Sequence, residues 1–167
     1  KLEESQYFNY QDLFSKELHK ELSDINQAKY NYQFKNNFIK TISKMETASS
    51  NQKSSASIIS GGFDSSIVGA YLLNNEIKTD IYTMTFSDKD PVAKNVKNIL
   101  NRNFNYKNIN HKIIECDLDA YHYSLCRSIE ILSSPVNTHS IPSSYIVAQN
   151  ARKNGNAILY GGEGADE

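Results

Sequence analysis

Short apolar runs rich in β-branched residues alternate with helical patterns through most of the 167-residue chain. The predicted strands are 56–59 (ASII), 79–86 (TDIYTMTF), 111–116 (HKIIEC) and 157–160 (AILY). The segments between them have helical apolar spacing, and the predicted helices are 67–73, 91–100, 118–132 and 141–152. Strands that alternate with helices join through right-handed crossovers into a parallel sheet. The sequence therefore predicts an α/β fold, with a parallel twisted sheet and helices on both faces.

The first fifty residues are mostly polar, with aromatic and aliphatic side chains at helical spacing. We predict a helical lead-in over 1–26, followed by a helix over 27–46 that opens a single domain spanning 27–167. The chain begins without methionine and stops at Glu167 inside a glycine-rich motif. We therefore expect both ends to lie within a longer protein, with the domain truncated at its C-terminal end.

Composition narrows the class of protein. The net charge of −1 argues against a nucleic-acid-binding surface, and no apolar run approaches the length of a membrane span. The two cysteines, Cys116 and Cys126, lack the spacing of a metal or redox motif. We therefore expect a cytoplasmic protein that binds neither membranes nor nucleic acid.

The turn SGGFDSS (60–66) lies between a predicted strand and a predicted helix. Its two glycines leave backbone N–H groups accessible, and its three serine hydroxyls and the helix start favour an anion. Asp64 would repel a phosphate alone but suits a divalent cation bound with it. No lysine follows the glycines, so the turn is not a Walker A loop. The structural alternative is a tight strand-to-helix turn with a serine or aspartate cap.

This turn resembles the PP-loop of the N-type ATP pyrophosphatases, which split ATP into AMP and pyrophosphate while adenylating a substrate. A second motif, GGEGADE (161–167), follows the fourth predicted strand and is similar to the SGEGADE signature of asparagine synthetases. Ser134-Pro135 and Ser140-Ile141-Pro142 are similar to the segment that links the two motifs in that family. The resemblance to the asparagine synthetase-like family covers residues 27–167 and implies the PP-loop fold, which is that of the adenine nucleotide alpha hydrolases.

The resemblance implies ATP and Mg²⁺ as ligands, and it assigns each site residue by its match to a motif. The pyrophosphate-binding positions are Ser60, Gly61, Gly62, Asp64, Ser65 and Ser66. The positions that frame the adenosine are Ile58, Ile59, Met84 and Gly162. Asp64 and Asp166 match the aspartates that hold magnesium. Glu163 matches the glutamate beside the acceptor substrate, with an implied catalytic role in positioning or deprotonating the incoming amine.

The implied reaction is that of an asparagine synthase-like carbon–nitrogen ligase. A carboxylate reacts with ATP to form an acyl-adenylate and pyrophosphate, and ammonia or another amine then forms the amide. The resemblance implies a small-molecule carboxylate, aspartate or an analogue, as substrate, and a possible glutaminase domain or subunit as nitrogen source. We expect this stretch of chain alone to be incomplete for the whole reaction.

The chain departs from the family pattern at several positions. Gly161 replaces the first serine of SGEGADE, Phe63 replaces the usual leucine, and 137–139 (Asn-Thr-His) replaces an arginine-containing stretch. The last change leaves open which carboxylate is activated, and it makes His139 a candidate substrate contact. Residues 88–90 are interpreted as a solvated turn. Two other functions remain open: another PP-loop ligase, such as a tRNA-modifying enzyme, and a catalytically silent nucleotide-binding domain.

Overall fold

The computed structural model describes residues 27–49, 54–87 and 89–163, and the chain divides into two compact units, 1–50 and 51–167. The predicted lead-in over 1–26 lies outside the described residues. In the first unit, helix α3 (Gln27–Ser49) covers the predicted helix and continues for three further residues. Its Phe34 and Phe38 rings stack with their centroids 6.4 Å apart.

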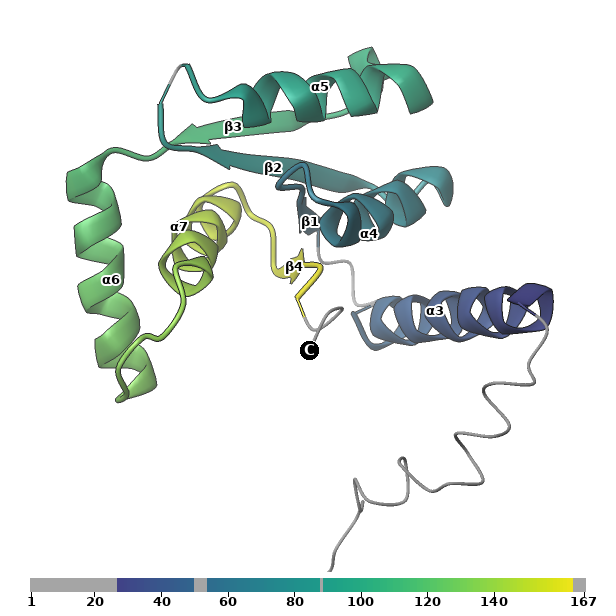
Figure 1. Cartoon of the computed structure of the whole chain (residues 1–167), viewed down its shortest axis with the longest axis horizontal. Helices are drawn as coiled ribbons and strands as arrows, with labels where there is room; N and C mark the ends of the chain where they lie inside the picture. The colour runs from purple at the N-terminus through teal and green to yellow at the C-terminus, as the bar shows by residue number, and fades with distance from the viewer. Residues whose placement is uncertain (1–26, 50–53, 88, 164–167) are drawn as a thin grey trace, which may run out of the picture. The chain divides into compact units, whose positions relative to one another are not determined.

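The second unit is built on a four-stranded parallel sheet in the order β3-β2-β1-β4 (Figure 1). The strands are β1 (Ser55–Ile58), β2 (Thr79–Thr85), β3 (His111–Glu115) and β4 (Ile158–Tyr160). All three pairings are parallel, with Ile58 opposite Tyr82 and Ser57 opposite Tyr160. The predicted parallel α/β fold is confirmed, and each strand boundary lies within one residue of its prediction.

Helices cover both faces of this sheet. They are α4 (Phe63–Asn74), α5 (Pro91–Asn103), α6 (Leu118–Leu132) and α7 (Ser140–Lys153), with a short 3₁₀ turn η1 (Tyr106–Asn108). On one face, Ile81 packs with Val96 and Leu100 of α5. On the other face, Tyr82 packs with Val147 and Ala151 of α7, and α6 packs against α7. Alternate residues of β2 therefore supply two separate apolar layers.

Aspartates begin two of these helices as side-chain caps. Asp90 accepts a hydrogen bond from the Val92 backbone nitrogen before α5, and Asp117 accepts one from the Ala120 nitrogen before α6. Such caps satisfy backbone donors that have no partner within the helix. Among the described residues, none of the helices combines the length and the apolar character needed to cross a lipid bilayer.

The strand order reverses at β1, and this reversal positions the functional site. From β1 the chain moves outward through β2 to β3, and then returns through α6 and α7 to place β4 on the opposite side of β1. In open parallel sheets, ligands bind at the carboxyl ends of the strands that flank such a reversal. The SGGFDSS turn follows β1, and Gly161, Gly162 and Glu163, the described start of the GGEGADE motif, follow β4, so both lie at this point.

Candidate functional site

A cavity of about 510 Å³ opens at the carboxyl ends of β1, β2 and β4, within the size range of small-molecule sites. Its walls come from the two glycine-containing loops, the segment after β2, and the start of α7. The lining residues are Ile58, Ser60, Gly62, Asp64, Ser65, Met84, Phe86, Asp90, Val92, His139, Ser140, Ser143, Ser144, Val147, Gly161, Gly162 and Glu163.

Serine hydroxyls fix the shape of the loop between β1 and α4. Ser60 Oγ lies 3.0 Å from Ser65 Oγ, and the Ser60 backbone nitrogen donates to the same hydroxyl oxygen at 3.2 Å. Ser66 Oγ donates to the Gly62 carbonyl at 2.6 Å. Gly61 has a φ of 85°, a backbone conformation that favours glycine, and it turns the chain into α4. Serine hydroxyls from the first turn of α4 therefore order the loop that precedes the helix.

The loop after β4 lies directly against the start of α4. A Cβ atom on Gly162 would lie 2.5 Å from the Ser65 backbone nitrogen and 2.7 Å from the Asp64 carbonyl carbon. No side chain fits at that distance, so this approach requires glycine. Gly162 and Ser65 both line the cavity, and the two motifs form one continuous wall.

Glu163 is held by a residue that the sequence prediction did not single out. Ser144, on α7, donates a hydrogen bond from its Oγ to Glu163 Oε1 at 3.0 Å. A Cβ atom on Gly161 would lie 3.0 Å from Glu163 Oε2, so the glycine at this position leaves room for the carboxylate to fold back. The sequence signal for Ser144 is the helical spacing of Ser140, Ser143 and Ser144, which all line the cavity.

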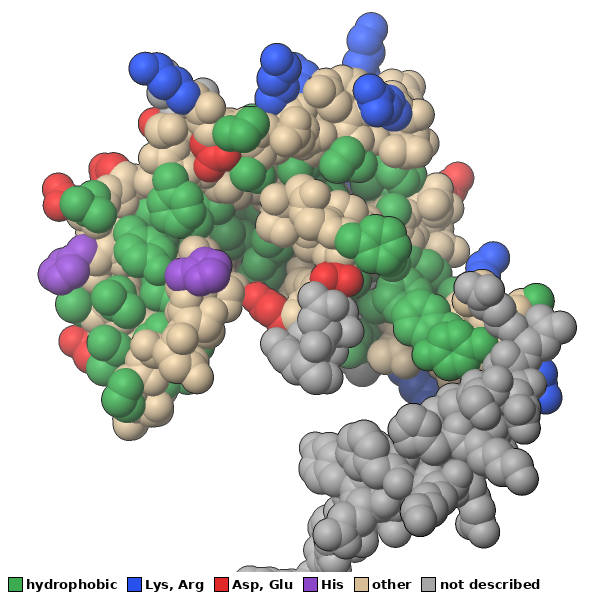
Figure 2. All heavy atoms as spheres, in the orientation of Figure 1, with side chains coloured by type: hydrophobic (Ala, Val, Ile, Leu, Met, Phe, Trp, Pro, Cys, Tyr) green, Lys and Arg blue, Asp and Glu red, His purple; other side chains and the backbone are tan. Residues whose placement is uncertain are grey.

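The cavity is acidic in character. Asp64, Asp90 and Glu163 line it, whereas lysine and arginine are missing from the part of its lining that the structure describes. On the face drawn in Figure 2, acidic side chains and a histidine lie near the middle of the view, while basic side chains gather along the upper edge over α5. A polyphosphate bound here needs positive charge from another source.

The donor set suits Mg²⁺. This ion prefers oxygen ligands and is usually held by one or two carboxylates together with substrate phosphates and water. Asp64 offers such a carboxylate from the first turn of α4, beside the hydroxyls of Ser60 and Ser65. The second predicted ligand, Asp166, lies outside the described residues. Within 27–49, 54–87 and 89–163, no three metal-ligating side chains form a preformed site.

The predicted adenosine-framing residues separate into two sets. Ile58 and Met84 line the cavity and pack against the apolar layer under α7, and Gly162 also lines it. Ile59 is only 1% exposed and lies in the opposite layer with Ile81, Val96 and Leu100. Successive strand residues point to opposite faces, so the side chains of Ile58 and Ile59 are directed to different layers. Gly61 and Ser66 belong to the loop but lie outside the cavity lining.

Three further residues reach the cavity from the segment after β2 and the start of α5. Phe86 lies at its edge with a 56% exposed side chain, and its ring meets the Tyr121 ring edge-on with the centroids 5.8 Å apart. Asp90 caps α5 and also accepts a hydrogen bond from the Phe86 backbone nitrogen. Val92 completes this wall. Asp90 thus caps α5 and also forms part of the cavity wall.

A sequence model of the asparagine synthase family matches residues 45–167, which is most of the chain. The chain belongs to the asparagine synthase family. No curated protein and no solved structure showed significant similarity to it. Membership confirms the resemblance predicted from the two glycine motifs, and the parallel α/β sheet is consistent with this family's fold. Asparagine synthase membership also supports a ligase that carries out ATP-dependent amidation.

Proposed function

We propose that the cavity binds ATP and that the protein forms an amide through an acyl-adenylate. The observation that carries the proposal is the direct packing of Gly162 on Ser65, which places Asp64 and Glu163 on the wall of one cavity. In open parallel sheets, nucleotides usually bind where the strand order reverses. The reversal at β1 therefore also supports ATP binding in this cavity.

In this proposal the polyphosphate of ATP lies along the loop from Ser60 to Ser66. The first backbone N–H groups of α4 have no intrahelical acceptor and carry the positive end of the helix dipole, so they stabilise negative charge. The adenosine lies against Ile58 and Met84, the apolar residues of the cavity wall. The predicted contribution of Ile59 then comes from its backbone, because its side chain is buried in the opposite layer.

Asp64 would hold Mg²⁺, with Asp166 as its predicted partner. When bound, the ion would neutralise the negative charge of the phosphates. The described residues that line the cavity are acidic and do not supply this positive charge.

The chemistry proceeds in two steps. A carboxylate oxygen of the substrate attacks the α-phosphorus of ATP, and pyrophosphate leaves. An amine then attacks the acyl carbon, AMP leaves with that carboxylate oxygen, and Glu163 accepts a proton from the attacking amine. Ser144 orients the Glu163 carboxylate through the 3.0 Å hydrogen bond. The substrate is a small-molecule carboxylate, aspartate or an analogue, and His139 lies where it can contact this substrate.

The test is the exchange of labelled pyrophosphate into ATP by the full-length protein, with Mg²⁺ and a panel of carboxylates that begins with aspartate. Exchange that depends on one carboxylate supports adenylation. Binding of ATP without exchange under any carboxylate would instead identify a catalytically silent nucleotide-binding domain.

Asp64→Asn and Asp119→Asn form a matched pair for this assay. Both aspartates lie in the first turn of a helix, α4 and α6, so both substitutions remove a similar favourable interaction with the helix dipole, about 0.3–1 kcal/mol. Only Asp64 lines the cavity. We expect Asp64→Asn to lower exchange by about 100-fold or more because polyphosphate charge is then left uncompensated. Asp119→Asn should retain exchange, and equal activity of the two variants would contradict the metal-binding role of Asp64.

A further inference from the structure

The last residue before the SGGFDSS turn is fixed to β2 through both of its backbone polar atoms. The Ile59 nitrogen donates to the Tyr82 carbonyl at 2.9 Å, which continues the ladder between β1 and β2. The Ile59 carbonyl accepts a hydrogen bond from the side chain of Thr83, with 2.9 Å between Thr83 Oγ1 and the carbonyl oxygen. Thr83 is fully buried, on the face of the sheet covered by α5. The Thr83 hydroxyl therefore holds Ile59 at the point where the chain leaves the sheet.

The direction of the hydrogen bonds around Thr83 follows from its single hydroxyl proton. Because that proton is donated to Ile59, Thr83 Oγ1 acts as the acceptor for His111 Nε2, which lies 2.9 Å away. His111 Nδ1 then accepts from the Tyr106 hydroxyl at 3.0 Å. Burial, and secondarily the charge of Lys97, lower the pKa of His111, in agreement with a neutral ring that has one donor and one acceptor.

The Ile59 carbonyl and the Ser60 N–H group belong to the same planar peptide unit, so fixing one fixes the direction of the other. The Ser60 nitrogen donates to Ser65 Oγ at 3.2 Å, and Ser65 Oγ lies 3.0 Å from Ser60 Oγ. Both serines line the cavity, whereas Thr83 does not. A continuous series of contacts thus runs from a buried hydroxyl on β2 to the serines that face the ligand.

We propose that Thr83 is a positioning residue for the nucleotide-binding loop, with His111 and Tyr106 as its supports. The inference rests on the proposed ATP site and extends it to residues that never touch the ligand. Loss of the Thr83 hydroxyl leaves the Ile59 carbonyl without its side-chain donor. The Ile59–Ser60 peptide then loses one of the two hydrogen bonds that fix its orientation, and the two serines lose the arrangement that receives phosphate oxygens.

The same strand provides a matched control. Thr79 lies on the same face of β2 at its opposite end, where its buried Oγ1 is 2.8 Å from Ser55 Oγ. Thr79→Val and Thr83→Val therefore both remove a buried hydroxyl from β2 and exchange it for a methyl group. Only the second change removes a contact to the residue before the loop.

The experiment measures the dissociation constant of MgATP for the full-length wild type, Thr79→Val, Thr83→Val and Thr83→Ser, at a temperature where thermal unfolding shows each to be folded. We expect Thr83→Val to weaken binding about tenfold, the equivalent of one hydrogen bond. Thr83→Ser should bind within twofold of wild type because it keeps the hydroxyl, and Thr79→Val should do the same. His111→Phe, at a half-buried position of β3, is a second variant. It should give a smaller loss, about threefold, since it removes the hydrogen bonds to Thr83 and Tyr106 but keeps the Thr83 hydroxyl.

The outcomes separate the two proposals. A wild type without affinity for MgATP would overturn the proposed ATP site and this inference with it. Wild-type binding accompanied by unchanged binding in Thr83→Val and His111→Phe would overturn the positioning role alone. Equal losses in Thr79→Val and Thr83→Val would also overturn it, because they would show a general effect of weakening β2.

Discussion

Gly162 lies directly on the backbone of Ser65, so close that a methyl group on the glycine would come within 2.5 Å of the serine nitrogen. The two residues lie far apart in the sequence, one after β4 and the other in the first turn of α4. Their contact joins the two conspicuous motifs of the chain into one surface at the strand reversal. Nucleotide affinity and the local packing of these loops should therefore depend on each other.

Gly162→Ala should lower both MgATP affinity and stability, because backbone atoms cannot move aside as a flexible side chain can. We expect a loss of about 1–3 kcal/mol in the free energy of unfolding, typical of overpacking. Gly155→Ala is the control, since Gly155 has a φ of 84° but no atom within 4 Å of an added Cβ. It should lower stability by about 1–2 kcal/mol through backbone strain while MgATP affinity stays unchanged. Denaturant unfolding and nucleotide titration check both variants, and wild-type affinity in Gly162→Ala would contradict the coupling of the two loops.

Glu163→Gln should separate the two proposed chemical steps. The amide oxygen can still accept from Ser144, so the side chain keeps its position, but it no longer takes a proton from the amine. We expect pyrophosphate exchange within a few-fold of wild type and amide formation reduced by about 10²–10⁴-fold, the usual contribution of general base catalysis. Ser144→Ala, which keeps the carboxylate and removes its orienting donor, should lower amide formation less. An equal loss of exchange and of amide formation in Glu163→Gln would contradict this division of roles.

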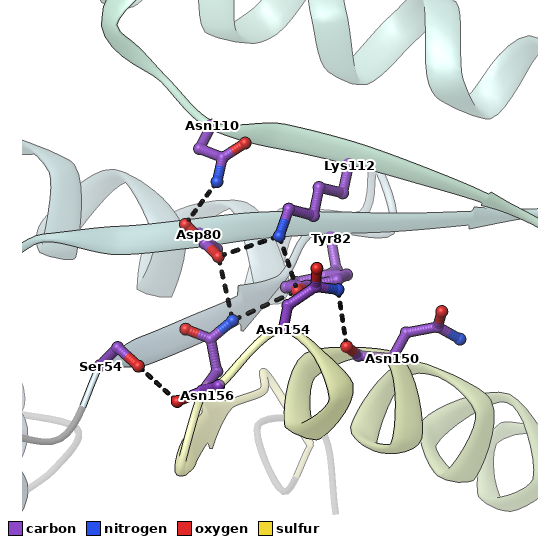
Figure 3. A network of polar contacts seen from close by, with 9 residues as sticks. Ser54, Asp80, Tyr82, Asn110, Lys112, Asn150, Asn154 and Asn156 are labelled. Carbon is purple, nitrogen blue, oxygen red and sulfur yellow. Dashed lines mark hydrogen bonds and ion pairs between the residues drawn. The ribbon is translucent and has the colours of Figure 1, made fainter.

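Asp80 should make the stability of the sheet depend on pH. It lies at the amino-terminal end of β2, away from the cavity, and accepts hydrogen bonds from Asn110, Lys112 and Asn156 (Figure 3). Asn156 and Lys112 also donate to the Tyr82 hydroxyl, so this polar cluster ties the turn after α7 to β2 and β3.

The protonation of the Asp80 carboxyl group sets the pH range in which stability should change. Burial raises the pKa of Asp80, but the hydrogen bonds from Asn156, Asn110 and Lys112 and the charge of Lys112 outweigh it, so the pKa lies below its ordinary value of 3.8. The folded state therefore binds the proton less readily than the unfolded state, and this stabilisation is present above pH 3.8 and lost as the pH falls through the folded pKa. Urea unfolding between pH 7 and pH 3 should show a loss below pH 3.8 in wild type that is reduced in Asp80→Asn. A profile unchanged by Asp80→Asn would refute the assignment.

The order of strands and helices was predictable because each element carries its own periodicity. The starts of helices were predicted less accurately where polar residues form the first turn. The predicted helix started at 67, whereas α4 starts at Phe63, because Gly62 and Asp64 belong to its cap and first turn while their residue types also suit a loop. The described part of each glycine motif lies at the same edge of the sheet, since each motif follows a parallel strand.

Contacts between elements left no comparable signal in the sequence. Ser144 and Glu163 are joined only by the packing of α7 beside the loop after β4. Thr83 and His111 fit the alternation of ordinary strands, and nothing local marks them as neighbours of the loop. Prediction from motifs therefore found the residues proposed to touch ATP, and the structure was needed to find those that hold them in place.

The most direct test of the account is the fate of the carboxylate oxygen. The full-length protein is given ATP, an amine donor and the carboxylate that supports pyrophosphate exchange, labelled with ¹⁸O in its carboxyl group, and the products are analysed by mass spectrometry. Formation of an acyl-adenylate predicts that AMP acquires one ¹⁸O atom and that pyrophosphate acquires none. Release of ADP with ¹⁸O in inorganic phosphate would show activation through an acyl phosphate and would contradict the proposed chemistry.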